Sequence, residues 1–197
     1  MTQPPDFIAD RYRVRAVLGQ GGMGVVYRVH DERDDCELAL KQLTLRGEHA
    51  QMATTLFERE FLTLSELAHP RVVQVCDYGV DPEGPYYTME LLPGEDLRTL
   101  GKQPWQRACE LLRDLASSLA ILHSRRLLHN DVSPRNVRCT PDGRAKLIDF
   151  GAMSAMGVNK RIVGTPPFTA PETLNQQALD GRSDLYALGA LAYGLMT

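Results

Sequence analysis

The chain has 197 residues, of which 43% are hydrophobic and 24% charged, a composition typical of a globular protein with a buried core. Its net charge of −3 and the lack of a long basic run give no reason to expect a nucleic-acid partner. The four cysteines form no CxxC pair, which favours reduced thiols in a cytoplasmic protein over a zinc or redox motif. The N-terminal residues lack a signal-peptide pattern, and Leu185–Met196 is too short an apolar stretch to span a bilayer.

The first part of the chain is predicted to be mostly β. Tyr12–Leu18 and Val25–Val29 are rich in β-branched and aromatic residues and enclose a glycine-rich turn. A stripe of apolar residues at helical spacing predicts a helix over Ala50–Ala68, which His69-Pro70 ends. Further strands are predicted at Glu37–Leu45, Val72–Tyr78 and Tyr86–Leu91.

The character changes after Pro93-Gly94, which we interpret as a hinge. A long amphipathic helix is predicted next, with Trp105 near its start and one apolar face made of Ala108, Leu111, Leu112, Leu115, Leu119 and Leu122. Short strands at Val137–Cys139 and Ala145–Ile148 follow, and a last helix begins at about Ser183. A mostly β half is therefore expected to precede a mostly helical half.

A glycine-rich string occupies the first predicted turn. Leu18–Val26 reads LGQGGMGVV, and glycines at this spacing let backbone amides approach phosphate oxygens closely. A glycine-rich hairpin turn without a ligand would look similar. The segment that follows is predicted to be a strand and not a helix, which disfavours a dinucleotide-binding fold.

Lys41 lies inside an apolar strand, where a lysine costs desolvation unless it pairs with an anion or faces the surface. Glu60 shares the apolar face of the following helix with Phe57, whereas Glu58 does not. We therefore expect Lys41 to pair with Glu60, an arrangement that would hold the ammonium against nucleotide phosphates.

Two strings in the second half carry the chemistry. HNDVSPRN, from His129 to Asn136, and DFG, from Asp149 to Gly151, supply Asp131, Asn136 and Asp149. These residues offer one proton acceptor and two oxygen ligands for Mg²⁺, which takes few protein ligands when it binds with a nucleotide. The pattern points to phosphoryl transfer.

The order of these motifs resembles that of the eukaryotic-type protein kinases, in their bacterial Ser/Thr branch. APE at Ala170–Glu172 and SDLYALG at Ser183–Gly189 extend the resemblance from about Tyr12 to Thr197. It implies an α+β, bilobal protein-kinase-like fold with a tail at 1–11, an N-lobe at 12–92 and a mainly helical C-lobe at 93–197. The last helices of the family are missing, so we expect a fragment of a longer protein.

The resemblance implies a Ser/Thr protein kinase that transfers the ATP γ-phosphate to a protein hydroxyl with Mg²⁺. Asp131 would be catalytic, with Lys41 and Glu60, while Asn136 and Asp149 would bind the metal. Among the nucleotide contacts, Val26 and Ala39 would enclose adenine, Met89 would be the gatekeeper, Glu90 and Leu92 would offer backbone hydrogen bonds, and Asp96 would reach the ribose. The full implied set is Leu18, Gly19, Gln20, Gly21, Gly22, Met23, Gly24, Val25, Val26, Ala39, Lys41, Met89, Glu90, Leu92, Asp96 and Arg138.

The sequence departs from the family pattern near these residues. Asn130 replaces the arginine that commonly binds an activation-loop phosphate, and Ser154 is the single hydroxyl residue from Asp149 to Gly164. We therefore expect no switching by activation-loop phosphorylation. Ser133 replaces a lysine expected near the γ-phosphate, and Arg138 stands where an apolar side chain normally forms the floor under adenine.

Two alternative functions stay open. The departures and the early end of the chain are compatible with a pseudokinase that acts as a nucleotide-binding or scaffold module. The aminoglycoside and choline phosphotransferases share an HxDxxxxN…DF core, but they lack the glycine loop, APE and SDLYALG strings. The protein substrate and the oligomeric state are not readable from the sequence.

Overall fold

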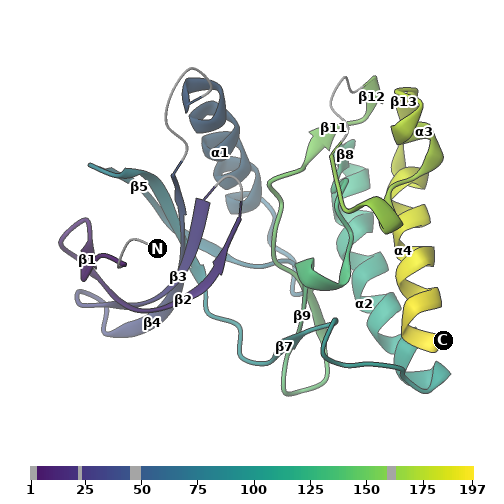
Figure 1. Ribbon diagram of the computed structural model, residues 1–197, viewed down its shortest axis with the longest axis horizontal. Helices are drawn as coiled ribbons and strands as arrows, with labels where there is room; N and C mark the ends of the chain where they lie inside the picture. The colour runs from purple at the N-terminus through teal and green to yellow at the C-terminus, as the bar shows by residue number, and fades with distance from the viewer. Residues whose placement is uncertain (1–3, 22–23, 45–49, 159–162) are drawn as a thin grey trace. The chain divides into compact units, whose positions relative to one another are not determined.

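The structure is a computed structural model that describes residues 4–21, 24–44, 50–158 and 163–197 (Figure 1). The fold is α+β, and the chain divides into two compact units. The first comprises Met1–Ala68 and Gln74–Leu92, and the second His69–Val73 and Pro93–Thr197. No helix in the described ranges has both the length and the hydropathy that a membrane span requires.

An antiparallel sheet forms the first unit, with the strand order β1-β2-β3-β4-β6-β5 among the described residues. One face carries a core of tyrosine and aliphatic side chains, because alternate residues of β3 and β4 point to the same side. The strands are β1 (Phe7–Ile8), β2 (Tyr12–Gln20), β3 (Gly24–Asp31), β4 (Cys36–Leu43), β5 (Val75–Asp81) and β6 (Gly84–Glu90).

The helix of this unit, α1 (Ala50–Ser65), packs through one face. Its buried residues are Phe57, Glu60 and Leu64, which recur at the spacing of one to two helical turns. The Phe57 ring lies 4.9 Å from the ring of Tyr87 on β6, centroid to centroid. The helix predicted over Ala50–Ala68 is present, but it ends at Ser65, three residues before the predicted end.

The expected N-terminal tail, residues 1–11, contributes a strand to the sheet. Phe7 and Ile8 pair with Arg13 and Tyr12, and Ile8 is only 1% exposed. The prediction of a tail was wrong here because a two-residue strand carries too short a pattern to be recognised in the sequence. Burial of one isoleucine side chain stabilises such a strand by roughly 1.5–3 kcal/mol.

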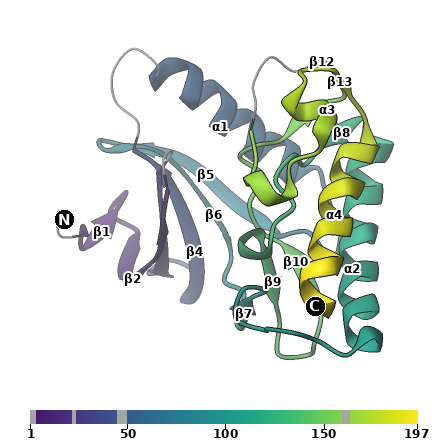
Figure 2. The same ribbon diagram turned by 45° about the vertical axis from the view of Figure 1, so that its right-hand side comes forward.

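The second unit is built around two helices, α2 (Trp105–Ser124) and α4 (Gly181–Met196), which run side by side (Figures 1 and 2). The predicted apolar stripe of α2 is buried at Ala108, Leu111, Leu115, Leu119 and Leu122. The buried apolar residues of α4 are Ala187, Leu191 and Leu195. The core of this unit therefore lies along the facing stripes of the two helices.

Short elements connect these helices. Strands β7 (Glu95–Asp96), β9 (Val137–Cys139) and β10 (Ala145–Leu147) form one small sheet, with β9 in the middle. Strands β8 (Leu127–Leu128) and β11 (Ser154–Ala155) pair, as do β12 (Gly157–Val158) and β13 (Ala178–Leu179). The remaining elements are the helix α3 (Pro171–Leu174) and the 3₁₀ turns η1 (Pro134–Asn136) and η2 (Pro166–Phe168).

Residues 69–73 belong to the second unit, which corrects the predicted N-lobe of 12–92 and the predicted strand Val72–Tyr78. The amide of Val73 donates to the carbonyl of Leu147, and Val72 forms a bridge with the same residue. The hydroxyl of Ser118 on α2 donates to the carbonyl of Arg71 at 2.7 Å. The backbone groups of this segment thus find their partners on β10 and α2.

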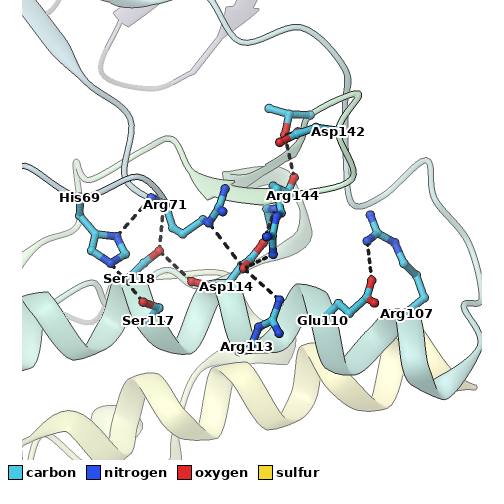
Figure 3. Close-up of polar contacts among 12 residues, drawn as sticks. His69, Arg71, Arg107, Glu110, Arg113, Asp114, Ser117, Ser118, Asp142 and Arg144 are labelled. Atoms are coloured by element: carbon cyan, nitrogen blue, oxygen red, sulfur yellow. Dashed lines mark hydrogen bonds and ion pairs between the residues drawn. The ribbon is translucent and has the colours of Figure 1, made fainter.

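A buried carboxylate holds this region together (Figure 3). Asp114 on α2 accepts a hydrogen bond from the amide of Ala145 at 3.2 Å, and its side chain is only 7% exposed. The guanidinium groups of Arg71 and Arg144 lie 3.5 and 3.4 Å from the same carboxylate. One side chain therefore ties the segment 69–73 and the β9–β10 hairpin to α2.

We expect Asp114→Ala to lower the free energy of unfolding by about 2 kcal/mol, because it leaves a buried amide and the partly exposed guanidinium groups of Arg71 and Arg144 without their acceptor. Denaturant unfolding measures this loss. Glu110→Ala is the matched control on the same helix: its ion pair with Arg107 is exposed, so a change below about 0.5 kcal/mol is expected. Equal effects of the two variants would contradict the role assigned to Asp114.

Candidate active site

The expected ion pair between Lys41 and Glu60 is present in the first unit. Lys41 Nζ lies 2.8 Å from Glu60 Oε1, and the two side chains are 15% and 5% exposed. The hydroxyl of Tyr87 donates to the same oxygen at 3.0 Å. Glu58, the competing partner, is exposed on the other side of α1. The lysine is thus held by a buried carboxylate that is itself fixed by a tyrosine.

The strand register places several predicted nucleotide contacts on one face of the sheet. Lys41 lies opposite Val26 on β3 and opposite Tyr87 on β6. Ala39 lies opposite Met89, and it shares the face of Lys41 because the two are two residues apart on β4. Residues from three strands therefore converge around the lysine, an arrangement that the sequence alone did not specify.

The glycine-rich turn connects β2 and β3. The amide of Gly21 donates to the carbonyl of Gly24 at 2.9 Å, which closes the turn. At Gly24 a Cβ atom would collide with the carbonyl of Gln42, so this position requires glycine. Leu18, Gly19 and Gln20 belong to β2, while the predicted contacts Gly22 and Met23 lie outside the described residues.

At the end of β6, one of the two backbone groups of Glu90 that were expected to contact adenine is already hydrogen-bonded within the sheet. The amide of Glu90 donates to the carbonyl of Gln74 at 2.9 Å, so this amide serves the sheet. The carboxylate of Glu90 also accepts from the amide of Gln74 at 2.8 Å. The expected backbone contact of Glu90 with adenine is therefore reduced to its carbonyl oxygen, and the contact expected from Leu92 stays a prediction.

In the second unit the loop from His129 to Asn136 is anchored by Asp184 on α4. The carboxylate of Asp184 is 1% exposed and accepts from the amides of His129 and Asn130, both at 2.9 Å. It also lies 2.9 Å from Nε2 of His123. The ring of His129 packs against Phe150 of the DFG string, with centroids 4.9 Å apart. The two strings that carry the chemistry are thus in direct contact.

Asp131 is the most densely hydrogen-bonded residue of this loop. Its Oδ1 accepts from the hydroxyl of Thr165 at 2.7 Å. Its Oδ2 accepts from Asn136 Nδ2 at 2.8 Å and from Arg135 Nη2 at 2.9 Å. Burial acts to raise the pKa of this carboxyl, but the hydrogen bonds from Arg135 and Thr165 outweigh it and lower the pKa below 3.8. Asp131 is therefore an ionised acceptor at neutral pH.

Asn136 and Asp149 are brought close by the β9–β10 pair. Val137 pairs with Leu147, and the amide of Ile148 donates to the carbonyl of Asn136 at 3.1 Å. Asn136 Nδ2 donates to the carbonyl and to the carboxylate of Asp131. The side-chain oxygen of Asn136 therefore faces away from Asp131. Asp149 is exposed. An amide and a carboxylate oxygen fit the needs of Mg²⁺, which retains several other oxygen ligands.

Asp96 and Arg138 lie opposite each other on β7 and β9, but both have local partners. The carboxylate of Asp96 accepts from the Nη2 of Arg98 at 2.5 Å and from its Nε at 3.1 Å. These hydrogen bonds lower the pKa of Asp96. Arg138 Nη1 donates to the carbonyl of Gly94 at 3.3 Å. A ribose contact by Asp96 would have to compete with Arg98.

Asn130 makes contacts of its own in place of the expected arginine. Its Nδ2 donates to the carbonyl of Ala152 at 2.8 Å and to the hydroxyl of Ser154 at 2.9 Å. Its φ of 62° is a left-handed conformation that asparagine tolerates better than most residues. Asn130 thus connects its loop to the segment after DFG by neutral hydrogen bonds.

The sequence-based reasoning missed several of these functional contacts. Asp184 belongs to the SDLYALG string, and that signal was noted without a role for the aspartate. Thr165 was assigned only to a loop expected to face the substrate, and the head group of Arg135 was not placed. All three contacts join residues that are either distant in the chain or dependent on a turn, so spacing alone does not reveal them.

The chain matches the protein kinase domain family over residues 12–197, and it therefore belongs to that family. It is 34% identical to a probable serine/threonine-protein kinase of Streptomyces coelicolor, over 99% of this chain and 31% of that protein. It is 36% identical to the serine/threonine-protein kinase PknL of Mycobacterium tuberculosis, over 95% of this chain and 49% of that protein. It is 35% identical to RqkA, a DNA damage-responsive serine/threonine-protein kinase of Deinococcus radiodurans, over 96% of this chain and 30% of that protein.

The chain thus spans about a third to a half of the length of these relatives. The bacterial Ser/Thr branch expected from the motifs is confirmed by these relatives. The family match over nearly the whole chain argues against the small-molecule phosphotransferase alternative.

We expect Arg138→Leu to tighten binding of Mg-ATP about fivefold, or ~1 kcal/mol, because a leucine would offer the purine an apolar surface. Isothermal titration calorimetry measures this affinity. Arg113→Leu, which adds the same side chain to an exposed position of α2, should leave the affinity unchanged. Unchanged or weaker binding by Arg138→Leu would contradict the idea that the arginine leaves the floor under adenine incomplete.

Proposed function

We propose that the chain is the catalytic domain of a Ser/Thr protein kinase, which transfers the γ-phosphate of ATP to a protein hydroxyl. The observation that carries this proposal is the hydrogen bond of 2.7 Å from the Thr165 hydroxyl to Asp131. An aliphatic hydroxyl donates here to an ionised, buried carboxylate, which is the contact that a serine or threonine of a substrate needs before phosphoryl transfer.

Each residue has a role that follows from its surroundings. Lys41, fixed by Glu60, would bind the α- and β-phosphates, and the backbone of the glycine-rich turn would cover the phosphates. Asp131 would orient the substrate hydroxyl and accept its proton. ATP supplies the phosphoryl group when bound, with Mg²⁺ held by Asn136 and Asp149 neutralising its charge. Catalysis would rest mainly on positioning and electrostatics.

The nucleotide contacts of the first unit follow from the sheet face around Lys41. Val26 and Ala39 would enclose adenine, Met89 would be the gatekeeper, and the Glu90 carbonyl and Leu92 amide would bind its edge. Asp96 stays the candidate for the ribose, at the cost of its contacts with Arg98.

We also propose that the domain works in the cytoplasm, where ATP is available and thiols stay reduced. Its four cysteines are all unpaired, which supports this location. A net charge of −3 favours proteins over nucleic acids as partners.

A second candidate is a pseudokinase, a nucleotide-binding or scaffold module. The observations that favour it are the contacts of Asp96 with Arg98 and of Arg138 with Gly94, because both draw expected nucleotide contacts to other partners. This candidate predicts a folded domain that transfers no phosphate, whether or not it binds a nucleotide.

We expect the protein to phosphorylate a basic protein substrate with radiolabelled Mg-ATP, and Asp131→Asn to lower the rate at least 100-fold, because the general base and its charge are lost. Circular dichroism would check that the variant is folded. The same residual signal from both proteins would mean that the site has no intrinsic activity and would favour the module.

We further expect this activity to be independent of phosphate between Asp149 and Thr165. Asn130 holds the segment after DFG by neutral hydrogen bonds, so no phosphate is needed to attract it. Treatment with a phosphatase, checked by mass spectrometry, should leave the rate unchanged. A stoichiometric phosphate whose removal abolishes activity would contradict this expectation. Residues 159–162 of this segment lie outside the described residues.

A further inference from the structure

Three arginine side chains of the second unit gather around one oxygen of Asp114 (Figure 3). Arg71 Nε and Arg144 Nη1 lie 3.5 and 3.4 Å from Asp114 Oδ1. Arg113 Nη2 lies 4.0 Å from the same oxygen. The other oxygen, Oδ2, accepts from the amide of Ala145 at 3.2 Å. We call Arg71, Arg113 and Arg144 the arginine cluster.

The carboxylate of Asp114 does not balance the charge of the arginine cluster. It carries one negative charge against three positive charges, and no other carboxylate in the part of the chain that the structure describes forms an ion pair with these arginines. A close hydrogen bond between a guanidinium and a carboxylate is about 2.7–2.9 Å long, so the three contacts are loose. Because like charges repel, a further anion beside the cluster would be stabilised.

Neighbouring charges show that this excess is confined to the cluster. Arg107 Nη1, also on α2, lies 3.0 Å from Glu110 Oε2, so one carboxylate neutralises that arginine. Asp142, on the β9–β10 hairpin, accepts from the hydroxyl of Thr140, and it forms no ion pair with the cluster among the residues described. The uncompensated positive charge therefore belongs to the three arginines around Asp114.

The arginine cluster is open to solvent and has donors to spare. The side chains of Arg71, Arg144 and Arg113 are 21%, 40% and 66% exposed. Each guanidinium carries five N–H donors, and a single loose contact with Asp114 leaves donors that can face an incoming anion. The cluster thus offers both the charge and the hydrogen bonds that an anion needs.

Hydrogen bonds fix the three backbone segments that carry the cluster. The carbonyl of Arg71 accepts from the hydroxyl of Ser118 at 2.7 Å, which ties the segment 69–73 to α2. The carbonyl of Arg144 accepts from the amide of Thr140 at 2.9 Å, within the β9–β10 hairpin. Arg113 lies inside α2. Because these backbones are already ordered, binding an anion costs little further loss of freedom.

We propose that the arginine cluster binds the phosphate group of a phosphoserine or phosphothreonine in a partner protein. A phosphate carries a charge of about −2 and three acceptor oxygens, so it can accept from guanidinium groups that reach it from three segments. A carboxylate offers a single charge, which Asp114 already supplies. The choice of a protein phosphate rests on the proposed function, whose products are phosphoserine and phosphothreonine. The anion site itself does not depend on that function.

The binding test uses a labelled alanine–glycine peptide with one central phosphothreonine, measured by fluorescence anisotropy. We expect the same peptide with threonine to bind at least about tenfold more weakly. The double variant Arg113→Gln, Arg144→Gln should weaken binding of the phosphopeptide at least about tenfold, because two of the three charges are lost. Arg182→Gln is the matched control, since Arg182 has its own carboxylate, Asp180, at 2.8 Å, and its affinity should be unchanged.

Two further measurements locate the bound phosphate. In ¹⁵N spectra of the arginine side chains, the phosphopeptide should shift the signals of Arg113 and Arg144 but not that of Arg182. Asp131→Asn should leave the affinity for the phosphopeptide unchanged, because the arginine cluster shares no residue with the candidate active site. Thermal unfolding of each variant checks that the fold is retained.

The outcomes separate the phosphate site from the proposed function. Equal affinity for the two peptides, an unaltered affinity in the double variant, or a changed affinity in Asp131→Asn would overturn the inference. Binding of inorganic phosphate or of a single-stranded oligonucleotide as tightly as the phosphopeptide would overturn the choice of a protein partner. Absence of phosphoryl transfer by the original protein would refute the kinase function and leave the phosphate site standing.

Discussion

The buried carboxylate of Asp184 is the constraint on which the loop from His129 to Asn136 depends. Two consecutive backbone amides, those of His129 and Asn130, point at this one side chain, and Asn130 takes a left-handed conformation to allow it. A buried carboxylate is costly unless hydrogen bonds satisfy it, and here each oxygen accepts a backbone N–H. Asp131 follows directly in the chain, so its direction is set by an anchor on α4.

The two units fix the charged side chains of the candidate site in different ways. In the first unit, a lysine is placed by strand register and fixed by a glutamate that α1 carries to it. In the second unit, Asp131 is placed by a loop whose backbone is hydrogen-bonded to Leu97, to Ile148 and to Asp184 on α4. Both charged groups are largely buried and paired. The Lys41–Glu60 pair is buried on both sides, and a buried ion pair is expensive to break by the loss of one partner.

The departures from the family pattern form a consistent set. Asn130 bonds to the segment after DFG, Arg138 bonds to the carbonyl of Gly94, and Arg98 bonds to Asp96. In each case a polar side chain has a neighbour within its own unit. Positions that the resemblance assigns to a phosphate or a nucleotide therefore have internal partners, whereas Asp131 and the Lys41–Glu60 pair have the contacts that the proposed function needs.

The sequence by itself determined the family, the order of the main helices and strands, and the residue types that carry the chemistry. Hydrophobic periodicity is local, so it was enough to predict α1 and α2 and to place Glu60 on the buried face. The tertiary structure alone decided that residues 69–73 join the second unit, that β1 adds to the sheet, and that Arg135 reaches Asp131. These outcomes depend on hydrogen bonds across long sequence separations or on the exact path of a turn, and no local pattern encodes them.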